Sequence, residues 1–163
     1  MKILGIDPGY GIIGWSLISS SLKIIDYGTI ETSPDLPIEK RLCKIYEDIT
    51  AIIEDFHPDH MALERLFFKK NTTTAIDVAK AIGVMTMTAG RFGIELFEYT
   101  PTQIKFSITG YGQATKKQIQ LLIKKIFNIK DIPEPDDAAD ALAIALCHCL
   151  SSSLKKSRGR TSG

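Results

Sequence analysis

Four carboxylates interrupt apolar segments of the chain and are the first candidates for chemistry. Asp7 ends an apolar run and precedes Pro8 and Gly9 in the stretch GIDPG, and Glu64 lies within MALERLFF. Asp137 and Asp140 stand near the start of the apolar segment DDAADALAIALCHCL. An ionised carboxylate in apolar surroundings is costly unless a cation or hydrogen-bond donors compensate it. Each of the four positions therefore needs a compensating partner.

A shared metal site is one explanation for these acids. Carboxylates packed together repel one another and take up protons, whereas divalent cations between them form a hard-oxygen site suited to Mg²⁺ or Mn²⁺. Two such ions about 4 Å apart activate a water and stabilise the leaving oxygen in phosphodiester hydrolysis. The alternative is local: Asp7 caps a turn, and Asp136 and Asp137 cap a helix N-terminus. That alternative leaves Asp140 unexplained, because it lies one turn further on among alanines.

The periodicity of apolar residues predicts the elements that carry these acids. Strand patterns alternate with helical ones in the order βββ-α-β-α-β-α-α-α, without an internal repeat. The order predicts an α/β fold in which helices pack on a mixed sheet. The expected strands cover 2–6, 11–19, 23–31, 60–68 and 95–99, and the expected helices cover about 38–56, 71–91, a segment opened by Thr100 and Pro101, 115–129 and 136–150.

These elements place the acids on buried faces. Asp7 comes at the carboxyl end of the first strand, the edge of α/β sheets where ligands tend to bind. Glu64 shares a strand face with Ala62, because side chains two residues apart point the same way. Asp137 and Asp140 project from one helix face, and we expect that face to pack against the sheet.

The composition is that of one soluble domain. The chain has 163 residues, of which 44% are hydrophobic and 24% charged, which is ordinary for a globular protein. No run of about 20 apolar residues is present for a bilayer, and Asp7 breaks the only candidate signal segment, so we expect a cytoplasmic protein without membrane contact. Residues 1–150 carry a charge of −3 and residues 151–163 carry +4, which together give the net charge of +1. The basic, Ser-rich tail over 151–163 is expected to be disordered.

The three cysteines are expected to be reduced, buried thiols. Cys147 and Cys149 flank His148, but this spacing is closer than that of zinc ligands, and the sequence has no second ligand pair. We interpret the triplet as the end of a packed helix.

Four motifs together resemble the RuvC family of Holliday-junction resolvases, and the resemblance covers about residues 2–150. The motifs are GIDPG, ERLFFKKN, GYGQATKKQIQ and DAADALAIALCH. The resemblance implies a ribonuclease-H-like sheet, three antiparallel strands then two parallel, in which the first and fourth strands are neighbours. It also implies a homodimer that nicks four-way DNA junctions symmetrically in recombination and repair, with two Mg²⁺ ions per site and a branch-migration motor as a partner. The implied catalytic and metal-binding acids are Asp7, Glu64, Asp137 and Asp140.

Two lysines match family positions beside the scissile phosphate. They are Lys105 in TQIKFSI and Lys116 in GQATKKQ, with Lys117 as the register alternative to Lys116. Cations at such positions bind phosphate and stabilise the charge that develops in the transition state. The alternative is that both are solvated helix lysines.

The segment after Glu64 resembles the family's junction-contacting region. Phe67 matches an aromatic that acts at the opened centre of the junction, although strand alternation predicts that one of Phe67 and Phe68 is ordinary core. Aromatics beside lysines suit stacking on an unpaired base while phosphates are bound. The accompanying DNA-binding candidates are Lys69, Lys70 and Asn71.

One position departs from the family pattern. Ile82 precedes Gly83 where many members have Arg, which leaves Lys80 as a possible substitute for a phosphate contact. The helix over 71–91 has more apolar and small residues than one buried face needs, so it is a candidate dimer interface, and a two-fold substrate favours a two-fold enzyme.

Three other functions fit parts of the pattern. ATP-handling modules of the actin and sugar-kinase type also open with a strand, Asp and a Gly-rich turn, but they need two lobes. A YqgF-like nuclease shares the Asp-Pro-Gly opening, and a non-cleaving junction-binding protein would share the fold. Four intact acids and the DAADALA segment favour the RuvC-like nuclease over these.

Overall fold

The computed structural model describes residues 1–66 and 72–159. This part of the chain holds five strands and five helices in the predicted order. Their bounds are β1 Lys2–Asp7, β2 Ile12–Ser19, β3 Ile24–Glu31, α1 Ile38–Phe56, β4 His60–Glu64, α2 Thr72–Arg91, β5 Glu95–Tyr99, α3 Pro101–Thr109, α4 Lys116–Phe127 and α5 Asp136–Gly159.

The strands form a single mixed sheet in the order β3-β2-β1-β4-β5. β1 pairs with β2 and β2 with β3 in antiparallel register, whereas β1–β4 and β4–β5 are parallel. This confirms the ribonuclease-H-like arrangement of three antiparallel strands followed by two parallel ones. In the β1–β4 ladder Ile6 lies opposite Leu63. Asp7 and Glu64, the next residues of the two strands, therefore leave the sheet side by side.

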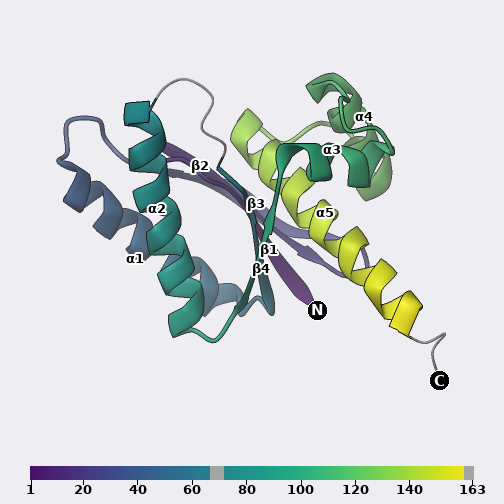
Figure 1. Cartoon of the computed structure of the whole chain (residues 1–163), viewed down its shortest axis with the longest axis horizontal. Coiled ribbons are helices and arrows are strands. Elements are labelled where there is room, and N and C mark those ends of the chain that lie inside the picture. The colour runs from purple at the N-terminus through teal and green to yellow at the C-terminus, as the bar shows by residue number, and fades with distance from the viewer. Residues whose placement is uncertain (67–71, 160–163) are drawn as a thin grey trace.

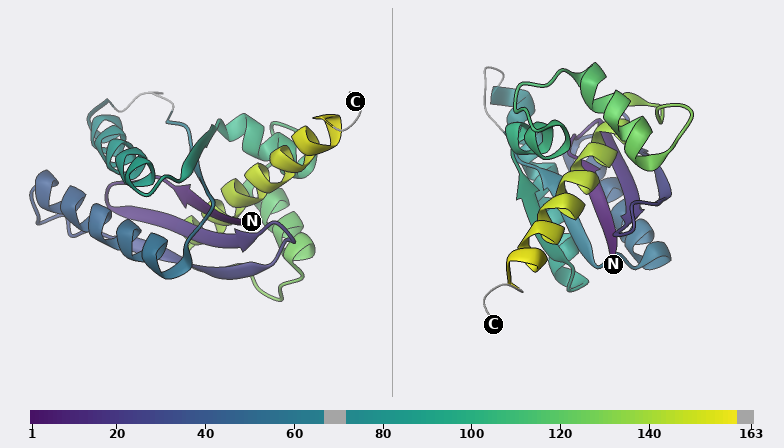
Figure 2. Two further views of the ribbon diagram at one scale, coloured as in Figure 1. Left: turned by 90° about the horizontal axis from the view of Figure 1, so that it is seen from below. Right: turned by 90° about the vertical axis from the view of Figure 1, so that its right-hand side faces the viewer.

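Helices cover both faces of the sheet. α1 and α2 lie on one side, and α5 lies on the other with α3 and α4 beside it (Figure 1; Figure 2). Alternation along β1 explains both layers: Leu4 and Ile6 pack in the core with α1 and α2, and Ile3 packs under α5. Fully burying one such side chain contributes about 1.5–3 kcal/mol. Within the described residues, none of the helices combines the length and apolar character that crossing a bilayer requires.

The first half of α5 lies directly on β1 and β2 because two glycines leave room for it. A Cβ at Gly5 would lie 2.5 Å from the carbonyl oxygen of Ala141, and one at Gly14 would collide with the carbonyl of Asp137. Backbone atoms cannot move aside as a flexible side chain can. The glycines of the sheet thus set how closely the acidic end of α5 approaches Asp7.

Three features differ from the sequence-based expectations. β4 ends at Glu64 rather than continuing to Phe68, because its partner β5 ends at Tyr99, where Thr100 begins to cap α3. α5 continues to Gly159, into the segment expected to be a disordered tail. Cys43 is exposed rather than buried, since it lies off the inward stripe of α1.

The Cys-His-Cys triplet lies in a packed helix, as predicted, but in its middle rather than at its end, because α5 continues to Gly159. Cys147, His148 and Cys149 are all at least 97% buried, and their side chains leave α5 in different directions. The Cys147 thiol points to the carbonyl of Gln103, and the Cys149 thiol points to that of Ser20. Burial raises the pKa of both thiols, which keeps them protonated.

Candidate active site

Five charged side chains from five different elements line one cavity of about 310 Å³. Asp7 comes from the end of β1, Glu64 from the end of β4, and Asp140 from the second turn of α5. Lys105 of α3 and Lys116 of α4 complete the charged lining. The apolar part of the wall consists of Pro101, Ile104, Ile119 and Ala143. Acids and cations far apart in the sequence therefore meet at the carboxyl ends of β1 and β4.

Asp7 is the most strongly perturbed carboxyl of the cavity. Burial raises its pKa from 3.8 to about 7, with further upward contributions from the charges of Asp140, Glu64 and Asp137 and a smaller downward one from Lys116. All three other predicted acids thus act on Asp7 directly. Their repulsion is what a cluster of carboxylates experiences when no cation separates them.

The other two lining acids are perturbed in the same direction. Burial raises the pKa of Glu64, and the charge of Asp140 raises it further, whereas the charge of Lys105 lowers it. Burial also raises the pKa of Asp140, against the opposing hydrogen bond and charge of Lys116. Asp137 acts on both Asp7 and Asp140, although it does not line the cavity. The structure therefore brings the four predicted acids together electrostatically, three of them in one wall.

Lys116 is held at the cavity by two acids of α5. Its Nζ lies 2.8 Å from Oδ2 of Asp140 and 3.2 Å from Oδ2 of Asp136. Burial lowers the pKa of Lys116, but hydrogen bonds to these carboxylates and their charges outweigh it and raise the pKa. A cation in the first turn of a helix opposes the helix dipole, so the acids rather than α4 itself favour its placement. The capping box between Thr115 and Gln118 fixes where α4 begins.

Lys105 is positioned by a second capped helix. Oγ1 of Thr100 accepts a hydrogen bond from the backbone amide of Gln103, and the side-chain oxygen of Gln103 accepts one from the backbone amide of Thr100. Pro101 occupies the first turn of the helix. Such a box satisfies two otherwise unpaired amides and fixes the helix start. The charge of Lys105 lowers the pKa of Glu64, which places the ammonium on the carboxylate side of α3.

The lining residues fit divalent cations by the chemistry of their donors. Carboxylate oxygens are the ligands that Mg²⁺ and Mn²⁺ prefer. Burial, with a smaller contribution from neighbouring carboxylates, raises the pKa values of Asp7, Glu64 and Asp140. In the described residues no three Asp, Glu, His or Cys side chains meet around one point, and Asp140 is engaged by Lys116. Holding an ion with all the acids requires Asp140 to leave that contact.

Comparison with known proteins identifies the family. The profile of the family described as crossover junction endodeoxyribonuclease RuvC matches residues 3–148. The chain belongs to the RuvC family. The crossover junction endodeoxyribonuclease RuvC of Thermotoga petrophila is 52% identical over 96% of both chains, and that of Caldicellulosiruptor saccharolyticus is 48% identical over 94% of this chain and 95% of its own.

Solved structures agree with the RuvC assignment. Thermus thermophilus RuvC in complex with a Holliday junction substrate has a TM-score of 0.89 and 31% identity, covering 95% of this chain and 96% of that one. The yeast mitochondrial Holliday junction resolvase has a TM-score of 0.69 at 15% identity, covering 96% of this chain and 81% of its own. The latter shows that the fold is shared.

Several predicted DNA-binding residues of this RuvC-family chain lie away from the cavity. Lys117 is exposed on α4 and does not line it. Lys80 pairs with Asp77 on α2, with Nζ 2.9 Å from Oδ1. Ile82 packs partly against the core under α1 and α2. The remaining candidates Phe67, Phe68, Lys69, Lys70 and Asn71 lie outside the described residues.

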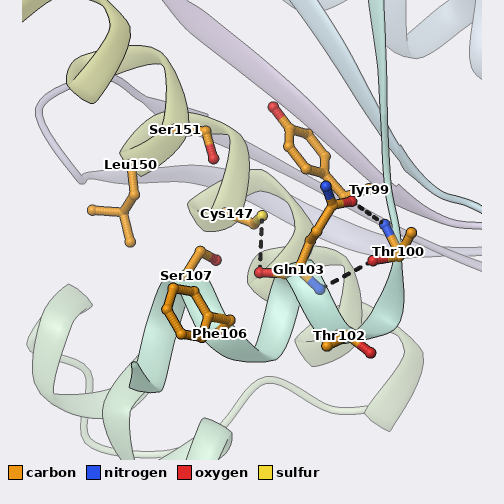
Figure 3. Close-up of a pocket in the computed structure, with 9 residues that line it drawn as sticks. All are labelled: Tyr99, Thr100, Thr102, Gln103, Phe106, Ser107, Cys147, Leu150 and Ser151. Carbon is orange, nitrogen blue, oxygen red and sulfur yellow. Dashed lines mark hydrogen bonds between the residues drawn. The ribbon is translucent and has the colours of Figure 1, made fainter. Parts of the chain in front are cut away.

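A second cavity was not predicted from the sequence. It has a volume of about 560 Å³ and lies between α3 and α5 (Figure 3). The residues that α3 contributes to it differ from those that α3 contributes to the carboxylate cavity. Phe106 and Leu150 form its apolar walls, and Cys147 and Gln103 line its floor. It is larger than the carboxylate cavity, but none of its lining residues is Asp, Glu, Lys, Arg or His. The charged cavity is therefore the candidate for hydrolytic chemistry.

A hydrogen-bonded histidine pair was also missed. Nδ1 of His60 lies 2.8 Å from Nε2 of His148, and Nδ1 of His148 lies 2.7 Å from the Tyr99 hydroxyl. This chain of contacts ties β4 and β5 to the middle of α5. No local pattern indicates it, because the three residues come from separate segments.

Proposed function

We propose that this protein is a metal-dependent endonuclease that resolves four-way DNA junctions in recombination and repair. The single observation that carries the proposal is the meeting of Asp7, Glu64 and Asp140 with two lysines in one cavity. That cavity belongs to a chain whose solved relative, at 31% identity, is bound to a Holliday junction. A phosphodiester substrate needs cations beside the acids that drive hydrolysis, and the cavity contains both.

The four acids are proposed to hold the metal. Asp7 and Glu64 offer rigid ligands because they end paired strands, and Asp140 and Asp137 approach from α5. We propose Mg²⁺, with Mn²⁺ as a substitute and two ions per site. When bound, such ions activate a water and stabilise the leaving oxygen of phosphodiester hydrolysis.

The two lysines are proposed to act on the phosphate. Lys116 reaches the cavity from the start of α4 and Lys105 from the middle of α3. Both are donors placed where negative charge increases in the transition state, which is where such groups act most strongly. Lys116 exchanges its contact with Asp140 for one with the phosphate. Since Lys117 does not line the cavity, we assign this role to Lys116.

A homodimer through α2 completes the proposal. Ile76 and Met87 are 52% and 51% exposed, and Gly83 and Gly90 lie on the same side of the helix, where a Cβ at either position would have no neighbouring atom within 4 Å. Exposed apolar and small residues on one helix face are typical of a surface that another copy covers. A two-fold dimer presents two cavities to the two scissile strands.

The remaining sequence-based assignments stay part of the proposal. A branch-migration motor is a proposed partner, and the proposed location is the cytoplasm, where bacterial DNA is found. The proposed junction contacts outside the cavity are Phe67, Phe68, Lys69, Lys70, Asn71 and Lys80.

The test compares a synthetic mobile four-way junction with a linear duplex of matching sequence. We expect paired, symmetric nicks in the junction alone, lost in EDTA and in Asp140→Asn. Lys116→Gln and Lys117→Gln form a matched pair of adjacent lysines, of which only the first is expected to lose cleavage. Junction binding without nicks would favour a non-cleaving binder, and equal cutting of both DNAs would favour a less selective nuclease of the YqgF-like kind.

A further inference from the structure

Arg41 is a charged residue on the buried stripe of α1. The inward residues of this helix are Arg41, Ile45, Ile49 and Ile53, at intervals of four. Arg41 is only 8% exposed, and in the described part of the chain it forms no ion pair with a carboxylate. Burying a charge without a counter-charge is costly. An apolar residue would serve packing at less cost, so the guanidinium has another role.

The guanidinium contacts the loop over residues 8–11, which follows Asp7 and joins β1 to β2. Its Nη2 donates to the carbonyl oxygen of Tyr10 at 3.1 Å, and its Nε donates to Oγ1 of Thr32 at 2.8 Å. Its Cζ lies 4.2 Å from the centre of the Tyr10 ring, in a cation–π contact. Arg41 thus contacts both the ring and the backbone carbonyl of Tyr10. A planar guanidinium with donors in a fixed fork can satisfy all three contacts at once.

Thr32, which directly follows β3, forms two further hydrogen bonds with the loop. Its hydroxyl donates to the same Tyr10 carbonyl, and its amide donates to the carbonyl of Gly11 at 2.8 Å. Both of these loop carbonyls are therefore bound by residues outside the loop. A segment whose polar backbone groups are fixed in this way has little freedom to move.

The loop is tightly packed at both of its glycines, Gly9 and Gly11. A Cβ at Gly9 would collide with the carbonyl of Ile12, and one at Gly11 would lie 3.3 Å from Nη2 of Arg41. The two glycines allow the chain to turn tightly and allow Arg41 to approach. Asp7 pairs with Gly14 at the end of the β1–β2 ladder, and this loop joins the two strands directly after Asp7. A loop held in place therefore adds to the strand pairing in restraining the Asp7 carboxylate.

We propose that Arg41 is a positioning residue for Asp7, acting through a clamp formed by its contacts with the ring and carbonyl of Tyr10 and with the hydroxyl of Thr32. The inference rests on the proposed function, since it concerns the acid assigned there to the metal site. It explains why a cation stands among the isoleucines of α1, more than 30 residues from Asp7 along the chain. It also predicts that Lys, which keeps the charge but lacks the fork, cannot replace Arg at this position.

The test uses Arg41→Lys and Arg41→Gln, with Lys44→Gln as the control. Lys44 is on the same helix, and its ammonium makes an exposed pair with Asp48. Residues that orient metal ligands typically cost about 10–100-fold in affinity or activity when replaced. We expect the Mn²⁺ affinity, measured by calorimetry in the absence of DNA, to fall by a factor in this range in both Arg41 variants and to be unchanged in the control. We also expect faster amide hydrogen exchange over residues 9–12, with junction affinity unchanged.

Several outcomes would overturn the proposal. Wild-type Mn²⁺ affinity in Arg41→Lys would mean that the charge matters rather than the clamp, and unchanged exchange over 9–12 in Arg41→Gln would remove the mechanism. If Arg41→Gln fails to fold, the double variant Tyr10→Ala, Thr32→Val removes the ring and the hydroxyl that Arg41 contacts while leaving α1 intact. Wild-type Mn²⁺ affinity in that variant would equally refute the clamp. The Mn²⁺ and exchange measurements need no DNA. A wild-type protein that cuts no junction would therefore contradict the proposed function without affecting the comparison between wild type and the Arg41 variants.

Discussion

Replacing Asp7 by Asn should stabilise the metal-free protein while abolishing cleavage. Burial and neighbouring carboxylates raise the pKa of Asp7 from 3.8 to about 7. A carboxyl with a higher pKa in the folded than in the unfolded chain takes up a proton on folding between those two values. Stability in EDTA therefore falls as pH rises from about 4 to about 7 and is constant in this contribution above that. Asn has the same shape without the charge, so it escapes the penalty.

The size of the effect follows from the shift. About three pKa units at 1.36 kcal/mol each amount to about 4 kcal/mol at pH 8. At pH 5 only the interval from the unfolded pKa to 5 contributes, which is about 1.5 kcal/mol. For a domain of this size the larger value corresponds to a rise in Tm on the order of 10 °C. These are upper limits, because the neighbouring acids relax when Asp7 ionises.

The assay is thermal and urea denaturation of both proteins in EDTA at steps from pH 4 to pH 8. The gap in free energy of unfolding between Asp7→Asn and wild type should open above pH 4 and level off above pH 7. Adding Mg²⁺ should raise the stability of the wild type and leave the variant unchanged. Glu54→Gln, an exposed acid of α1, is the control and should show no gap. A variant that is no more stable than wild type at pH 8, or a gap independent of pH, would refute the reasoning.

Three further predictions concern the helices that carry the site. Gly14→Ala should destabilise the protein by about 1–3 kcal/mol in urea denaturation, because the new Cβ forces the start of α5 away from β2; wild-type stability would show that α5 can lift freely. Lys116→Gln should lower the single-turnover cleavage rate by about 10²–10³-fold with Lys117→Gln near wild type, and equal losses would contradict the assignment. Charged substitutions at two exposed positions of α2, Ile76→Glu and Met87→Glu, should convert a dimer into a monomer in sedimentation experiments without lowering Tm, whereas an unchanged mass would place the interface elsewhere.

The sequence by itself determined the order of elements and the strand or helix that carries each acid. Apolar alternation is local, so it identified β1 and the alternation along β4. The structure agrees, since Ala62 packs in the cluster under α5 whereas Met61 and Leu63 pack in the cluster under α1 and α2. An acid within an apolar run is a signal that one segment can carry, because burial without compensation is unfavourable wherever the segment packs. This is why Asp7 and Asp140 could be found without a structure.

Only the tertiary structure decided which cations meet those acids. Lys116 and Lys117 are adjacent on one helix, and a turn of about 100° between them directs one to the cavity and the other to solvent; nothing in their order distinguishes them. Arg41 acts on a loop distant in the chain, and its position among the isoleucines of α1 was the one sequence signal that could have indicated it. The end of β4 at Glu64 likewise depends on where β5 ends. Strand pairing and side-chain reach are set by contacts between distant segments, and those contacts exist only once the sheet and its helices have packed.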